Sequence, residues 1–134
     1  MRFLMLIAAL ISMLGVERSH AQIEPFTGHW LQTFSTAGDC PTCRISIRPE
    51  GDGFEVVSNN GWSASVATTT RPGEVSVIGT GIWDPQTGST DLGRKLRLFL
   101  LFDGQSLIMQ MAIGQEDGQQ QLIHANFVRD PSVR

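Results

Sequence analysis

The feature of this sequence that most constrains its fold is a two-residue alternation of apolar and polar side chains. Between Trp62 and Val66, for example, the apolar residues Trp62, Ala64 and Val66 alternate with two serines. Successive side chains of a β-strand point to opposite faces, so this pattern is typical of a strand with one buried and one solvated face. After residue 21, no stretch shows a convincing apolar repeat at helical spacing. The pattern therefore predicts an all-β domain.

Turn signals divide the alternating stretches into eight short predicted strands. Asn59-Asn60-Gly61, Arg71-Pro72-Gly73 and Asp103-Gly104 are residue combinations that favour tight turns. The predicted strands cover residues 27–35, 54–58, 74–83 and 94–103, with others around Cys43 to Ile47, Trp62 to Val66, Leu107 to Ile113 and Ile123 to Phe127. Glycines on an inward-facing row, such as Gly79 and Gly81, indicate a bend or a close approach by another group.

Short turns between consecutive strands predict an up-and-down meander. An open meander would leave unpaired backbone groups at its two edges, and closure into a barrel removes both edges. We therefore predict an eight-stranded antiparallel up-and-down β-barrel, with a two-layer β-sandwich as the alternative. A barrel of about eight strands has an interior that side chains fill or that holds one small ligand.

Residues 1–21 have the features of a secretory signal peptide. Arg2 is followed by an apolar run from Phe3 to Val16, and small residues precede Gln22 at Ser19 and Ala21. The apolar run is shorter than the roughly 20 residues that span a bilayer as a helix. We expect residues 22–134 to form a single barrel domain that is periplasmic or secreted, with no membrane association after signal cleavage.

Cys40 and Cys43 are the two cysteines of the chain, in the sequence Cys40-Pro41-Thr42-Cys43. In an exported protein such a pair is expected to form a disulfide. A redox-active pair is a second interpretation, because Cys-Pro-x-Cys also occurs in thiol oxidoreductases, and a metal site is a third. The alternating, proline-containing residues that follow read as a strand rather than a helix, which favours the structural disulfide.

Composition and motifs exclude several functions. The net charge is −3 and no basic patch extends beyond Arg94, Lys95 and Arg97, so nucleic acid is not an expected partner. The sequence has no recognisable motif that combines a nucleophile, a general base and a residue that orients the base, so we do not expect an enzyme. His29 and His124 are predicted to lie opposite each other on the outer surface of the first and last strands, far from the cysteines, so we expect neither a metal site nor a cofactor.

Alternating strand directions place the longer connections at one rim of the predicted barrel. That rim is where binding barrels place their opening. We expect a small apolar or aromatic ligand there, bound by large side chains of the inner wall: Phe34, Trp62, Trp83, Met109 and Met111. The competing interpretation is that these side chains fill the core.

Apolar residues also fall on the predicted outer face, most clearly along residues 94–103. Phe99, Leu101 and Ile108 belong to this set. A large exposed apolar patch on a soluble barrel usually marks a contact surface. The sequence therefore also predicts a homo-oligomer or a protein partner.

Two families share short motifs with this chain. The Gly28-His29-Trp30 motif and the basic Arg129 resemble the lipocalin-like (calycin) superfamily of small eight-stranded barrels. That resemblance implies a closed end in which Arg129 packs across Trp30, with Gly28 beside them, and a function as a binding module. Trp30, Cys43 and Ile45 are also similar to a pattern of small bacterial inhibitors of secreted metalloproteases, which would imply inhibition through residues 22–26. The first function is our main expectation; a protein-interaction module, either such an inhibitor or a self-assembling subunit, is the alternative.

Overall fold

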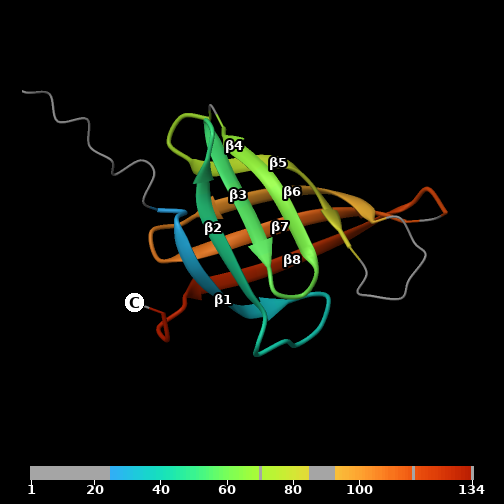
Figure 1. Cartoon of the computed structure of the whole chain (residues 1–134), viewed down its shortest axis with the longest axis horizontal. Coiled ribbons are helices and arrows are strands. Elements are labelled where there is room, and N and C mark those ends of the chain that lie inside the picture. The colour runs from blue at the N-terminus through green and yellow to red at the C-terminus, as the bar shows by residue number, and fades with distance from the viewer. Residues whose placement is uncertain (1–24, 70, 85–92, 116, 134) are drawn as a thin grey trace, which may run out of the picture.

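The computed structural model describes residues 25–69, 71–84, 93–115 and 117–133 and contains one closed eight-stranded antiparallel barrel (Figure 1). The predicted fold class is confirmed. The predicted signal peptide, residues 1–21, lies outside the described residues. The strands are β1 (Gly28–Ser35), β2 (Arg44–Glu50), β3 (Gly53–Ser58), β4 (Trp62–Thr68), β5 (Val75–Trp83), β6 (Arg94–Phe102), β7 (Ser106–Gly114) and β8 (Gln120–Arg129).

Each strand pairs with the next along the chain, and β8 returns to pair with β1. The pair Trp30 and Arg129 belongs to this closing ladder. In Figure 1, β2, β3 and β4 form the near wall, and β7 and β8 pass behind them at a steep angle. The closing ladder gives both terminal strands two neighbours, which distinguishes the barrel from the alternative sandwich.

The core lies on the inward-facing rows of the strands, as the alternation predicts. Buried apolar side chains from all eight strands and from the segment before β1 form one cluster. Its largest fully buried members are Trp30, Phe26, Phe127, Ile45, Leu96, Leu98, Leu100, Leu107 and Met111. Strand β5 contributes little bulk, because Gly79 and Gly81 occupy its inward row against the backbone of β4.

A β-bulge in β1 changes the direction of Phe34. Gln32 pairs with Phe127, whereas Phe34 pairs with Asn126, so Thr33 is an extra residue opposite β8. Phe34 consequently lies on the outer row with Asn126, and its side chain is 52% exposed. The prediction that Phe34 belongs to the inner wall with Trp30 is therefore wrong, because a one-residue insertion moves all later side chains to the other face.

One end of the barrel is closed by the segment that precedes β1. Phe26 is fully buried and packs against Phe54, with 5.8 Å between ring centroids. The Trp30 indole N–H donates to the carbonyl of Phe26 at 2.9 Å. The Arg129 guanidinium lies 4.1 Å from the Trp30 ring centroid and donates to the carbonyls of Pro25 and Thr27. Trp30 and Arg129 therefore hold Phe26 in place as a plug.

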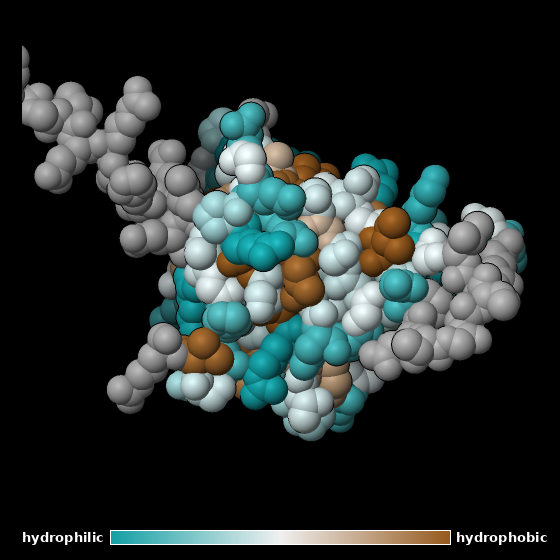
Figure 2. Space-filling view, viewed as in Figure 1, coloured by the Kyte–Doolittle hydropathy of each residue, from teal (hydrophilic) through white to brown (hydrophobic). Residues whose placement is uncertain are grey.

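The outer surface differs between the walls. On the near wall, the outward rows of β2, β3 and β4 are mainly polar, and Figure 2 shows only small hydrophobic patches there. On β5 to β7, by contrast, the predicted contact residues Phe99, Leu101 and Ile108 are half-buried. Their neighbour Ile78, which pairs with Phe99, is 47% exposed. These four residues form an apolar stripe across three strands.

Candidate functional site at the open end of the barrel

A cavity of about 310 Å³ lies at the end of the barrel opposite the Phe26 plug. Its wall consists of inward-facing side chains of the barrel, and its edge consists of the β1–β2 loop and the β3–β4 turn. The lining residues are Gln32, Ser35, Ala37, Gly38, Asp39, Cys40, Cys43, Asn60, Trp62, Trp83, Met109, Met111 and Ile123. Phe26 fills the interior of the barrel at one end, whereas the inward-facing side chains at the other end border this cavity.

The apolar part of the lining contains two tryptophans from neighbouring strands. Trp62 of β4 and Trp83 of β5 are direct cross-strand partners. Trp62 is only 4% exposed, whereas Trp83 is half-buried at the rim. Met109 and Met111, on the inward row of β7, also belong to the apolar part of the lining. Of the residues predicted to bind ligand, Trp62, Trp83, Met109 and Met111 line this cavity, while Phe34 lies outside the barrel.

The polar part of the lining comes from residues that the sequence analysis did not select. Gln32 lies two positions after Trp30 on the inward row of β1, and Asn60 lies in the β3–β4 turn. Neither side chain forms a hydrogen bond with another described residue. One sequence signal could have identified Gln32: it shares the predicted inward row with the apolar Trp30. A glutamine is unusual at such a position in a solid core, because a buried amide requires hydrogen-bond partners.

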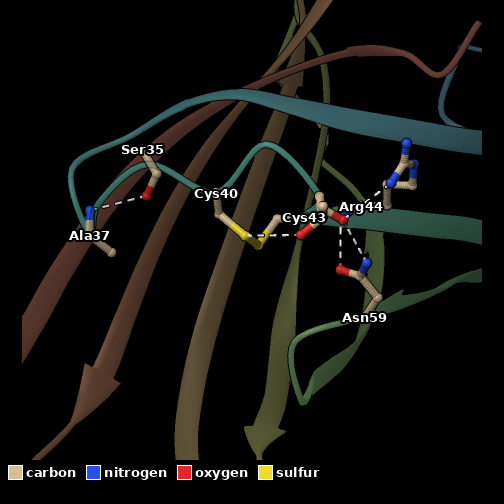
Figure 3. Close-up of a disulfide and its surroundings, with 7 residues drawn as sticks. Ser35, Ala37, Cys40, Cys43, Arg44 and Asn59 are labelled. Carbon is tan, nitrogen blue, oxygen red and sulfur yellow. Dashed lines mark hydrogen bonds between the residues drawn. A yellow bond between two sulfur atoms is a disulfide. The ribbon is translucent and has the colours of Figure 1, made fainter.

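The loop at the edge of the cavity is fixed by a disulfide between Cys40 and Cys43, which confirms that part of the prediction (Figure 3). The N–H of Cys43 also donates to the carbonyl of Cys40 at 3.1 Å. Across from this turn, the Asn59 side chain accepts from the Arg44 N–H at 2.9 Å and donates to the Thr42 carbonyl at 2.7 Å. The disulfide turn and the β3–β4 turn thus support each other.

Removing the disulfide is expected to destabilise the protein moderately. The bridged cysteines are 3 positions apart, and the chain-entropy relation for so short a loop gives about 2 kcal/mol. We expect a Cys40→Ser, Cys43→Ser double variant to lower the free energy of unfolding by roughly that amount, measured by urea denaturation. The wild-type protein measured with excess reductant serves as the control. Equal stability of the oxidised protein and the double variant would show that the hydrogen bonds of Asn59 fix the turn by themselves.

An ion pair on the outer side of β1 joins β2 to the end of β8. The carboxylate of Asp130 accepts from the Ser132 hydroxyl at 2.6 Å, from the Ser132 N–H at 3.0 Å and from Arg44 Nε at 2.6 Å. These hydrogen bonds, led by those of Ser132, lower the pKa of Asp130 from 3.8 to about 2. Nearby, partial burial lowers the pKa of Arg129.

This lowered pKa makes the contribution of Asp130 to stability depend on pH. The folded state binds a proton less readily than the unfolded state, so the contribution is complete above pH 4 and disappears as the pH falls toward 2. We expect Asp130→Asn to unfold at a lower urea concentration than the wild type at pH 7, and at nearly the same concentration near pH 2. A difference between the two proteins that stayed constant over this range would contradict the assignment.

The described residues contain little else that indicates chemistry. They include no cluster of three or more His, Cys, Asp or Glu side chains placed to hold a metal ion. The predicted neighbourhood of His29 and His124 is wrong. His124 lies beside Thr36 at one end of β1, whereas His29 lies beside Asp130 at the other. No helix in the described part of the chain is long and apolar enough to cross a membrane.

The fold and this cavity define the class of the protein: a closed up-and-down β-barrel that is plugged at one end and hollow at the other. Comparison with protein-family models, with curated proteins and with solved structures finds no match for the chain.

Proposed function

We propose that the protein is an exported, lipocalin-like binding module that holds a small apolar or aromatic ligand in the open end of the barrel. The observation that carries the proposal is the cavity between Trp62, Trp83 and the disulfide loop. Its wall combines flat aromatic rings, polarisable methionines and a few polar groups, a composition typical of small-molecule sites.

The size of the cavity limits the ligand. A dry cavity of about 150 Å³ holds a benzene molecule. The volume of about 310 Å³ is about twice that, near the lower end of the range for ligand pockets. A compact ligand with one or two rings matches this volume.

The proposed export rests on two features. The first 21 residues have the arrangement of a signal peptide. The second is the disulfide between Cys40 and Cys43, because structural disulfides persist in oxidising compartments. Both features support a periplasmic or secreted protein.

The proposal predicts ligand-dependent quenching of tryptophan emission. We expect 2-naphthylmethanol, a neutral two-ring probe, to quench emission saturably. Trp62→Ala and Trp83→Ala are each expected to weaken its binding at least about tenfold, because each removes an aromatic contact surface. Isothermal titration calorimetry checks the affinities independently of the missing fluorophore, and circular dichroism checks that each variant is folded.

Phe34→Ala provides a matched control for these variants. Phe34 is a large aromatic residue at the same end of the barrel as the cavity, but it lies on the outer surface. We expect this variant to bind the probe as the wild type does. Absence of saturable binding to the wild type, or equal weakening by Phe34→Ala, would argue against a site inside the barrel.

A second candidate function, a protein-interaction module, is favoured by the apolar stripe of Ile78, Phe99, Leu101 and Ile108 on the outer surface. Such a stripe is suited to self-association or to a protein partner. Sedimentation analysis tests self-association: a concentration-dependent dimer that Ile78→Lys converts to a monomer would support it. The inhibitor form of this hypothesis is less compatible with the geometry, because Phe26 at the end of the implied segment is fully buried.

A further inference from the structure

We propose that the open-end cavity selects ligands in which the aromatic body carries a positively charged amine, and that Asp39 recognises the charge. The inference rests on the proposed function and names the ligand class for that site. It is argued from the charge, the hydrogen bonding and the aromatic groups of the cavity lining.

Asp39 is the only charged residue among the described residues that line the cavity. It lies in the β1–β2 loop, immediately before the bridged Cys40, so the disulfide turn determines its position at the edge of the cavity. Its carboxylate forms no hydrogen bond or ion pair with any described residue. The carboxylate is therefore an acceptor with capacity for a ligand's N–H groups.

The rest of the lining also favours a cation. Trp62 and Trp83 present aromatic rings, whose faces attract an ammonium group. The Gln32 and Asn60 side chains are neutral amides whose carbonyl oxygens accept further N–H groups.

Among the described lining residues, a negatively charged ligand would find no group of opposite charge. The nearby Arg44 donates instead to the carboxylate of Asp130 at 2.6 Å. No arginine, lysine or histidine is among the described residues that line the cavity. Transfer of a carboxylate from water into this site would therefore lose hydration without gaining a partner.

Three probes of similar shape test the charge preference with the intact, oxidised protein. They are 2-naphthylmethylamine, which is a cation at pH 7, the neutral 2-naphthylmethanol, and the anionic 2-naphthoate. We expect the amine to bind about fivefold more tightly than the alcohol, and the carboxylate to bind more weakly than either. Isothermal titration calorimetry at low and moderate salt gives the affinities, and salt should reduce the preference for the amine.

Asp39→Asn is expected to bring the affinity for the amine down to that for the alcohol, while the alcohol binds as before. Asp84→Asn is the matched control, because Asp84 follows Trp83 at the same end of the barrel but does not line the cavity. This control variant should keep the preference for the amine.

The outcomes separate this inference from the proposed function. Equal affinities for amine and alcohol, tighter binding of the carboxylate, or a preference for the amine that survives Asp39→Asn would each overturn the inference while leaving the binding site in place. If none of the three probes binds to the wild-type protein, the proposed function fails, and this inference fails with it.

Discussion

Replacing Gly79 with alanine is expected to destabilise the barrel by about 3 kcal/mol or more. Gly79 lies on the inward row of β5, and a Cβ atom added there would lie 2.7 Å from the Cα atom of Val66 in β4. Real Cβ atoms do not approach a neighbouring backbone so closely, so the two strands would have to separate. Urea denaturation followed by circular dichroism measures the loss.

Gly114→Ala is a matched control for this prediction. Gly114 also lies in a strand of the barrel, but an added Cβ atom would make only an ordinary contact of 3.6 Å with the Lys95 carbonyl. We expect its free energy of unfolding to remain within about 0.5 kcal/mol of the wild type. If Gly79→Ala were as stable as Gly114→Ala, β4 and β5 would not be as close as the structure shows.

The close approach of β4 and β5 also affects the candidate site. The same two strands carry Trp62 and Trp83 as direct partners. Gly81, two residues before Trp83, repeats the close contact, with an added Cβ atom 2.7 Å from the Cα atom of Ala64. The glycines therefore allow β4 and β5 to pack closely beside the paired tryptophans.

Replacing Trp30 with alanine is expected to lower the free energy of unfolding by about 4 kcal/mol, within the range for large buried aromatic residues. Trp30 is fully buried, donates to the Phe26 carbonyl and forms a T-shaped contact with Phe102, with 6.2 Å between ring centroids. The substitution removes this packing and the stacking surface of Arg129. Urea denaturation at pH 7 measures the change.

Two further variants make this prediction specific. Trp30→Phe retains an aromatic ring but cannot donate to Phe26, so we expect it to lose about 1–2 kcal/mol. His29→Ala changes the exposed neighbour of Trp30 and removes one hydrogen bond, between the His29 ring and the Ser46 hydroxyl at 3.0 Å, so it should cost only about 1 kcal/mol or less. A loss below about 1 kcal/mol for Trp30→Ala would contradict the view that Trp30 holds the plug of the closed end.

The candidate site was predictable from the sequence only in part. Trp62, Trp83, Met109 and Met111 were found because each follows the two-residue alternation of a regular strand. Phe34 was misplaced because the bulge at Thr33 depends on the register between β1 and β8, which are distant in the sequence. Gln32, Asp39 and Asn60 were missed because their importance depends on the cavity that they border.

The closed end of the barrel was likewise predictable from the sequence only in part. The Gly28-His29-Trp30 motif and Arg129 were recognised from a resemblance, whereas the role of Phe26 was not. Phe26 precedes the first strand, so no alternation assigns it to the core. Its burial depends on contacts with Phe54 and with the groups that hold the segment in place.

The sequence by itself determined the strand number, the order of the strands and most of the inward-facing residues. It did so because alternation and turn residues are local properties, and because a meander with short turns can remove its edges only by closing. The tertiary structure alone decided the bulge in β1, the position of the plug and the hollow beside Trp62. These features depend on register and packing between segments far apart in the chain, which no local pattern records.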